Sequence, residues 1–214
     1  HRVDRRQRQM CIRDRAVPLA LGGDGNITLP LLRAASKAHS DLVVVHIDAH
    51  TDTYRGDGNQ DYMRFNVATT FTRAAEEALI DVESSIHVGA RGPTNDSGVF
   101  NHTRDVGYGL IDSTELFNAG LRNTAKNIVE SLKGRSVYLC FDMDFFDPSC
   151  APGVCTPTWG GATSREGLDF LQNLSGLNLV GADINTVSPP HDISGMTAFL
   201  AATVGLEILS LIHI

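Results

Sequence analysis

The sequence predicts an α/β fold with a parallel sheet, and three observations lead to that prediction. Short apolar runs alternate along the chain with segments of helical periodicity, which is the order of repeated strand and helix units. The run at 42–47 is apolar almost throughout, as in a strand covered on both faces of a parallel sheet. With 214 residues, 42% of them hydrophobic, the chain is long enough to bury one full core.

The first part of the chain begins with a strand and a helix. An apolar run predicts a strand at 17–21, and a glycine-rich turn at 22–26 separates it from a helix at about 29–39. The polar segment 54–66 contains glycines and is expected to be a loop. Apolar residues at helical spacing then predict a helix at 68–79.

The middle of the chain repeats the alternation. Short apolar runs predict strands at 85–88 and, more weakly, at 106–111. A helical pattern at 116–132 is interrupted near Gly120, and a further buried strand is expected at 136–141.

The last part closes the domain. Thr163 precedes Glu166 by three residues, which is the spacing of a capping box, so a helix is expected to begin there and to reach about residue 174. The apolar run at 177–187 predicts the last strand, and a closing helix is expected at 196–209.

The bulk composition excludes several classes of partner. A formal net charge of −7 argues against binding to nucleic acid or to an anionic membrane, and it is compatible with a small cationic substrate. Polar residues interrupt the longest apolar stretches before they reach the length of a membrane span, so no membrane association is expected. The four cysteines form no CxxC pair, which favours reduced thiols and a cytoplasmic location.

Both ends of the sequence differ in character from the rest. The first fifteen residues, HRVDRRQRQMCIRDR, are rich in arginine and have no apolar period, and the chain ends in SLIHI. Both strings resemble translated sequencing-adapter read-through. We therefore expect one domain at 16–209, with non-native tails at 1–15 and 210–214. The alternative is that the basic segment is a natural tail.

Two clusters of acids point to a metal site. HIDAHTD follows one apolar run and FDMDFFDP ends another, so Asp48, His50 and Asp52 recur at alternate positions, as do Asp142 and Asp144. Because strand side chains alternate between faces, each set is expected to point one way. Four carboxylates and an imidazole in one place require cations, and this set of oxygen and nitrogen ligands suits manganese.

These motifs carry a family resemblance. LGGDGNITLP, HIDAHTD, HVGARGP, FDMDFFDPSCAPGVCTPTWGG and DINTVSPPHDISGMTAFLAA occur in the order found in the ureohydrolases, the family of arginase and agmatinase. The resemblance extends over 17–207. It implies a three-layer α/β/α sandwich whose N-terminal portion is truncated in this chain. It also implies a trimer or hexamer, in which a homologous subunit is a possible partner.

The resemblance implies two manganese ions, with nickel as the alternative metal. By position, Asp48 and Asp142 would bridge the two ions. His50 and Asp144 would hold one ion, and Asp52 would hold the other.

The resemblance also implies roles around the metals. Asp183 would position the substrate or protonate the leaving amine, and it is the predicted catalytic residue. Thr186, His191 and Asn66 are the predicted substrate-binding residues. His46 and His87 lie within strands and are expected to be core or supporting histidines rather than ligands.

Three departures from the family pattern are evident. Gly25 replaces a ligating histidine, so the ion held by Asp52 is expected to bind more weakly. Thr186 stands where a carboxylate usually grips the guanidinium, and Val67 aligns with a histidine that transfers protons.

Three functions remain open from the sequence. The chain is expected to be an amidinohydrolase that releases urea from a guanidino compound. The alternatives are a catalytically degenerate subunit of a hetero-oligomer and a metal-dependent deacylase on the same fold.

Overall fold

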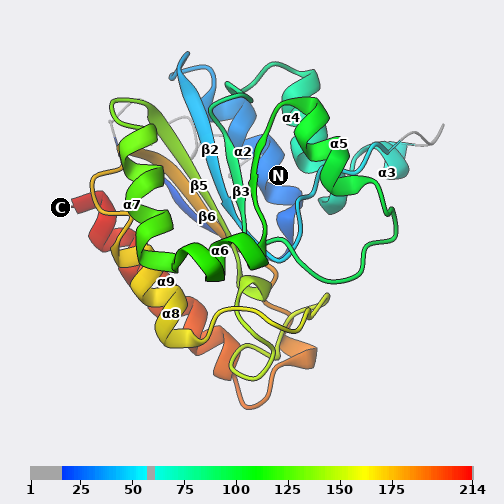
Figure 1. Cartoon of the computed structure of the whole chain (residues 1–214), viewed down its shortest axis with the longest axis vertical. Helices are drawn as coiled ribbons and strands as arrows, with labels where there is room; N and C mark the ends of the chain where they lie inside the picture. Colours follow the sequence, from blue (N-terminus) through cyan, green and yellow to red (C-terminus); the bar gives the residue numbers. More distant parts are fainter. Residues whose placement is uncertain (1–15, 57–60, 214) are drawn as a thin grey trace.

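A six-stranded parallel sheet forms the centre of the molecule (Figure 1). The computed structural model describes residues 16–56 and 61–213. Within that part, the strand order is β1-β6-β5-β2-β3-β4, and every neighbouring pair runs parallel. The strands are β1 (Leu19–Leu21), β2 (Leu42–Ile47), β3 (Ile86–Val88), β4 (Gly109–Ile111), β5 (Ser136–Asp142) and β6 (Leu179–Asn185). The predicted parallel α/β fold is confirmed.

Helices cover both faces of the sheet and complete three layers (Figure 1). The α-helices are α2 (Thr28–Ala35), α3 (Asp61–Arg64), α4 (Thr70–Glu76), α5 (Val99–Val106), α6 (Ser113–Ala119), α7 (Leu121–Ser131), α8 (Ser164–Gln172) and α9 (Met196–His213). Val43 and Val45 of β2 belong to the core shared with α6, α7, α8 and α9. Leu42 and Val44 belong to the opposite core, with α2 and α4. Alternate residues of one strand therefore serve both layers, which explains its continuous apolar run.

The order of the strands fixes where a ligand can bind. From β2 the chain builds outward through β3 and β4, and then it returns to place β5 on the other side of β2. Adjacent parallel strands whose connections diverge in this way leave a crevice at their carboxyl ends. Asp48 directly follows β2, and Asp142 is the last residue of β5.

Several boundaries differ from the sequence predictions. Val106 ends helix α5 rather than opening a strand, and β4 begins only at Gly109. The predicted break near Gly120 is confirmed, because this residue has φ 83° and separates α6 from α7. The expected loop at 54–66 contains α3, and the predicted helix at 68–79 divides into the 3-10 turn η2 (Val67–Thr69) and α4.

The last helix is more apolar than expected from the sequence. Helix α9 has 18 residues with a mean hydropathy of 1.6, so by length and composition it could cross a membrane. The expectation that polar residues interrupt every apolar stretch short of the length of a membrane span is therefore wrong. One such helix is weak evidence for a membrane span, and Val204 and Ile208 pack into the core. Phe199 and Leu206 are exposed. Helix α9 also continues past residue 209, where the sequence analysis placed the domain end.

Candidate metal centre

The register between β2 and β5 brings the two acid clusters together. Ile47 of β2 pairs with Phe141 of β5. The residues that follow them, Asp48 and Asp142, therefore lie at the same level of the sheet edge. Both residues are buried: Asp48 is 2% exposed and Asp142 is 1% exposed.

All five predicted ligands line one cavity of about 520 Å³ at this edge. Three sets of ligand atoms at or beside this cavity each lie within 4.8 Å of one another: Asp48, His50 and Asp144; His46, Asp48 and Asp52; and His46, Cys140 and Asp142. Because Asp48 belongs to the first two sets, the arrangement matches a pair of sites with a shared carboxylate. This set of carboxylate and imidazole donors fits divalent cations.

The ligands reach the cavity by more than strand alternation. Asp144 lies in the 3-10 turn η3 (Met143–Phe145) after β5, where it accepts hydrogen bonds from Ala49 N at 3.4 Å and from Thr156 Oγ1 at 3.2 Å. Asp52 follows β2 by several residues and has φ 49°, in the left-handed region. The convergence that the sequence predicted is present, but turns rather than strand pleats aim these two acids.

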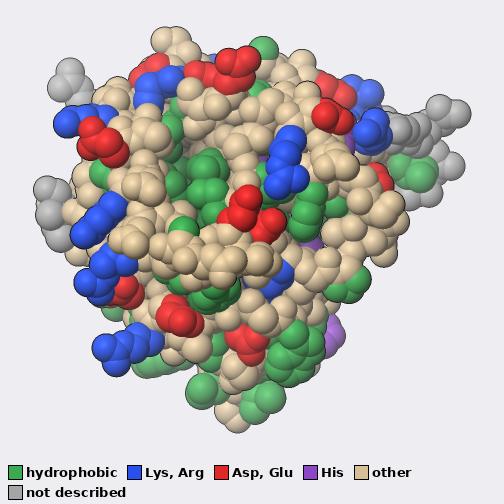
Figure 2. Space-filling view, in the orientation of Figure 1, with side chains coloured by type: hydrophobic (Ala, Val, Ile, Leu, Met, Phe, Trp, Pro, Cys, Tyr) green, Lys and Arg blue, Asp and Glu red, His purple; other side chains and the backbone are tan. Residues whose placement is uncertain are grey.

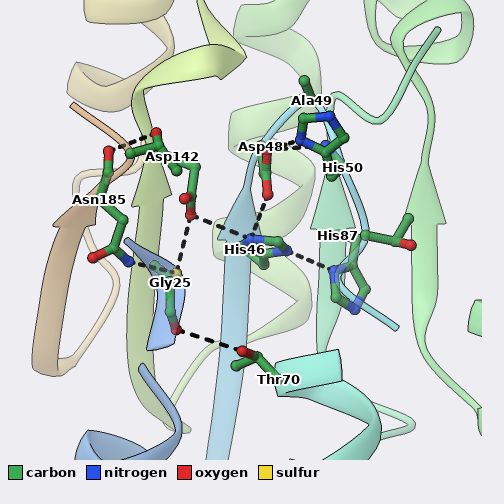
Figure 3. A network of polar contacts seen from close by, with 12 residues as sticks. Gly25, His46, Asp48, Ala49, His50, Thr70, His87, Asp142 and Asn185 are labelled. Carbon is green, nitrogen blue, oxygen red and sulfur yellow. Dashed lines mark hydrogen bonds and ion pairs between the residues drawn. The ribbon is translucent and has the colours of Figure 1, made fainter. Parts of the chain in front are cut away.

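Electrostatics tie the imidazoles to the carboxylates (Figure 3). Burial lowers the pKa of His46, but its contacts with Asp142 and Asp48 outweigh burial and raise it to about 10. Burial likewise opposes the contacts of His50 with Asp144 and Asp48, which raise its pKa to about 11. Burial and the charge of Asp48 raise the pKa of Asp142 to about 6. Imidazole protons and divalent cations therefore compete for the same carboxylates.

The three departures from the family pattern face this same cavity, since Gly25, Val67 and Thr186 all line it. A Cβ added to Gly25 would lie 3.6 Å from Asp52 Oδ2, which is ordinary contact, so the site has room for a side chain there. The φ of Gly25 is not in the positive range. Thr186 has φ 73°, and its hydroxyl accepts from Met143 N at 2.8 Å, so backbone contacts already engage it.

Asp183 and His191, two of the predicted site residues, do not line this cavity. Asp183 is fully buried inside β6, where Oδ2 accepts from Tyr138 OH at 2.7 Å, and it does not line the cavity. Strand position buries it beneath the site, and its contact with the substrate stays a prediction. His191 is exposed, with Nδ1 2.7 Å from Ser188 Oγ, and it does not line the cavity either.

Asn66 borders the neighbouring depression instead. That depression has a volume of about 970 Å³ and shares His50 and Thr156 with the cavity of the carboxylates. The Asn66 side chain caps the turn η2, because Oδ1 accepts from Ala68 N at 3.0 Å and Nδ2 donates to Met63 O at 2.9 Å.

Sequence reasoning missed the role of Arg91. This side chain is 8% exposed, and its Nη2 donates to Asp144 O at 2.7 Å and to Thr158 O at 2.8 Å. Further bonds reach the carbonyls of Phe146 and Trp159. One guanidinium thus holds the loop after β5 against the loop that ends in Trp159. An arginine between glycines, Gly-Ala-Arg-Gly, is the sequence signal that could have indicated such a role.

The surface around the site carries mixed charge. Figure 2 shows acidic and basic side chains interspersed on one face of the molecule, with hydrophobic side chains gathered at its lower end.

The chain is similar to known hydrolases over most of its length. A family model described as the arginase family matches residues 2–210. The chain is 38% identical over 196 residues to a guanidinobutyrase from Pseudomonas aeruginosa, covering 90% of this chain and 60% of that protein. It is 40% identical over 193 residues to an agmatinase from Photorhabdus laumondii, covering 90% of this chain and 59% of that protein.

A solved structure agrees with the sequence relatives. The proclavaminate amidino hydrolase from Streptomyces clavuligerus superposes with a TM-score of 0.84 at 37% identity, covering 91% of this chain and 64% of that one. The chain spans about 60% of the length of the two sequence relatives. The parallel three-layer fold, the converging acids and the match over residues 2–210 agree, and the chain belongs to the arginase family.

Proposed function

We propose that this chain is a metal-dependent hydrolase that cleaves a C–N bond of a guanidino compound and releases urea. One observation carries the proposal: four carboxylates and His50 converge on one cavity at the carboxyl edge of the sheet. A guanidinium carbon is resonance-stabilised and reacts poorly with neutral water. Divalent cations held by these groups would acidify water and so supply a nucleophile at neutral pH.

The donors favour manganese, with nickel as the alternative. Carboxylate oxygens and imidazole nitrogens dominate the set, and burial raises the pKa of the nearby buried thiol of Cys140 well above its ordinary value. We propose two ions, because two ligand sets share Asp48.

The chain's own residues orient the site and shape the entrance. The Thr156 hydroxyl and the Ala49 amide both donate to Asp144, and this fixes the direction of its carboxylate. The depression beside His50, lined by Tyr54 and Trp159, would receive the part of the substrate beyond the guanidino group.

Substrate choice should differ from that of the named relatives. Thr186 brings no charge to the cavity wall, and its hydroxyl already bonds to the backbone. A charge-assisted hydrogen bond contributes about 1.5–3 kcal/mol, so its absence costs roughly ten- to a hundredfold in affinity. Arginine and agmatine should therefore be poor substrates, and a smaller or less basic guanidino compound should be better.

The test is urea release by purified protein loaded with Mn²⁺ or Ni²⁺. The panel should contain guanidino compounds with carboxylate, ammonium and uncharged tails. Asp144→Asn is the control, because it removes a ligand while keeping the shape of the side chain. Urea release by the wild type that Asp144→Asn abolishes supports the proposal. Efficient hydrolysis of arginine or agmatine would refute the inference about substrate choice.

A second candidate is a subunit that supports an active homologue. The observation in its favour is that Gly25, Val67 and Thr186 all face the same cavity. If the chain alone releases no urea from any compound of the panel, but raises the activity of a homologous subunit mixed with it, this second function replaces the first.

A further inference from the structure

His46 is a buried side chain of the site with an unsatisfied ring nitrogen. It is fully buried, and its Nε2 makes no hydrogen bond. That atom nevertheless lies 3.1 Å from Asp48 Oδ2 and 3.4 Å from Asp142 Oδ2 (Figure 3). Nε2 thus makes two ion-pair contacts but no hydrogen bond of good geometry, and a cation bound between these atoms would satisfy the imidazole nitrogen and both carboxylates.

Asp52 is half-buried and faces the same place. No hydrogen bond or ion pair to its carboxylate is found among residues 16–56 and 61–213. Gly25 faces Asp52 Oδ2 and provides no side chain. His46 Nε2 and carboxylate oxygens of Asp48 and Asp52 lie within 4.8 Å of one another, so His46 is the imidazole within reach of Asp52.

We propose that His46 Nε2 is a metal ligand in this chain, binding one cation together with Asp48 and Asp52. The imidazole reaches this ion from within strand β2, in a chain where position 25 cannot provide one. The inference rests on the proposed dinuclear site and adds to it a histidine that the sequence predicted to be a core or supporting residue.

The spacing of the atoms supports this role. Ligand atoms about 2.0–2.2 Å from one ion lie roughly 3–3.5 Å from each other. The 3.1 Å separation from His46 Nε2 to Asp48 Oδ2 falls within that range, and His46 and Asp52 offer ligand atoms within 4.8 Å of each other.

A metal-binding histidine also needs a fixed tautomer, and His87 can provide it. A ligating histidine usually donates its other ring N–H to a fixed acceptor, which leaves the lone pair free for the metal. His46 Nδ1 lies 2.8 Å from His87 Nδ1. With His46 Nδ1–H as donor, His87 Nδ1 accepts and Nε2 of His46 is free to ligate. His87 is held by a ring contact with Tyr108 at 4.7 Å, so we assign it as a positioning residue.

The competing role for His46 is donation of Nε2–H to the carboxylates, and His46→Gln separates the two. A glutamine amide can replace the donated hydrogen bond but not an imidazole ligand. Mn²⁺ titration by calorimetry, with metal content measured on the same sample, should show two unequal sites in the wild type. In His46→Gln, the weaker site should lose at least tenfold in affinity. His39→Gln, distant from the cavity, is the matched control and should bind as the wild type does.

Rescue tests the assignment directly. Gly25→His in the His46→Gln background should restore the weaker site, because position 25 has space beside Asp52. Two sites of unchanged affinity in His46→Gln would overturn the inference while leaving the metal centre intact. A wild type that binds no Mn²⁺ would overturn both the inference and the proposed function.

A measurement on the wild type alone covers the case in which His46→Gln does not fold. Electron spin-echo modulation should detect imidazole nitrogen coupled to Mn²⁺ at the weaker site as well as at the tighter one. Absence of that coupling at the weaker site would overturn the inference. Metal binding without urea release would refute the proposed function and leave the ligand assignment standing.

Discussion

Replacement of Arg91 should destabilise the loops that form the site. The guanidinium is buried and donates to backbone carbonyls of two separate loops, so Arg91→Met leaves those carbonyls without their donor. The two shortest bonds, at 2.7 Å to Asp144 O and 2.8 Å to Thr158 O, are the strongest contributors. Hydrogen bonds that involve a charged group contribute about 1.5–3 kcal/mol each, so the expected loss is about 3–6 kcal/mol.

That loss is large for a domain of this size. Total stabilities are commonly about 5–15 kcal/mol, and 1 kcal/mol shifts the unfolding midpoint by about 2–4 °C at this chain length. Arg91→Met should therefore lower the midpoint by roughly 6–24 °C. Arg91→Lys keeps the charge but not the planar set of donors, so it should fall between the wild type and Arg91→Met.

Thermal unfolding followed by circular dichroism measures the change in midpoint temperature, and urea unfolding measures the change in the free energy of unfolding, each in EDTA and in saturating Mn²⁺. Arg122→Met is the matched control, because Arg122 pairs with Asp169 at 2.7 Å on an exposed helix surface, where such pairs contribute about 0–1 kcal/mol. The reasoning is refuted if Arg91→Met and Arg122→Met unfold at the same urea concentration.

Three further outcomes are expected. The folded-state pKa values of His46 and His50 are raised to about 10 and about 11, so their stabilisation is present below pH 6.5 and is lost as pH rises toward those values. Urea midpoints in EDTA should fall between pH 7 and pH 10, whereas added Mn²⁺ should stabilise more at higher pH; a flat profile in EDTA would contradict this. Thr186→Ser should raise the free energy of unfolding by up to about 1 kcal/mol, because serine removes a β-branch at φ 73° and keeps the hydroxyl that accepts from Met143 N. A lower urea midpoint would count against this expectation. Trp159→Ala should raise KM for apolar-tailed guanidino compounds without altering Mn²⁺ stoichiometry, which steady-state assays and metal analysis can check; an unchanged KM would remove Trp159 from the substrate site.

The local features of this molecule were readable from the sequence. The continuous apolar run of β2 predicted a strand buried on both faces. Helices do cover both faces of this strand. Thr163 and Glu166 predicted the start of α8, where both capping hydrogen bonds are present. The acids that follow β2 and β5 were identified as a cluster, because runs of charge after buried strands are visible in one dimension.

The departures at Gly25 and Thr186 were also visible in the sequence, but their surroundings were not. The open space beside Asp52 and the backbone bonds of the Thr186 hydroxyl depend on residues distant in the chain.

Tertiary structure alone decided which groups meet. The pairing of Ile47 with Phe141 joins segments almost a hundred residues apart, and it determines that Asp48 and Asp142 share one edge. Asp183 is only two residues from the end of β6, yet strand position buries it beneath the cavity, whereas His46 reaches the carboxylates from inside β2. Periodicity specifies which face a side chain takes within its own strand, but the neighbour across the sheet depends on strand order and register, which long-range packing determines.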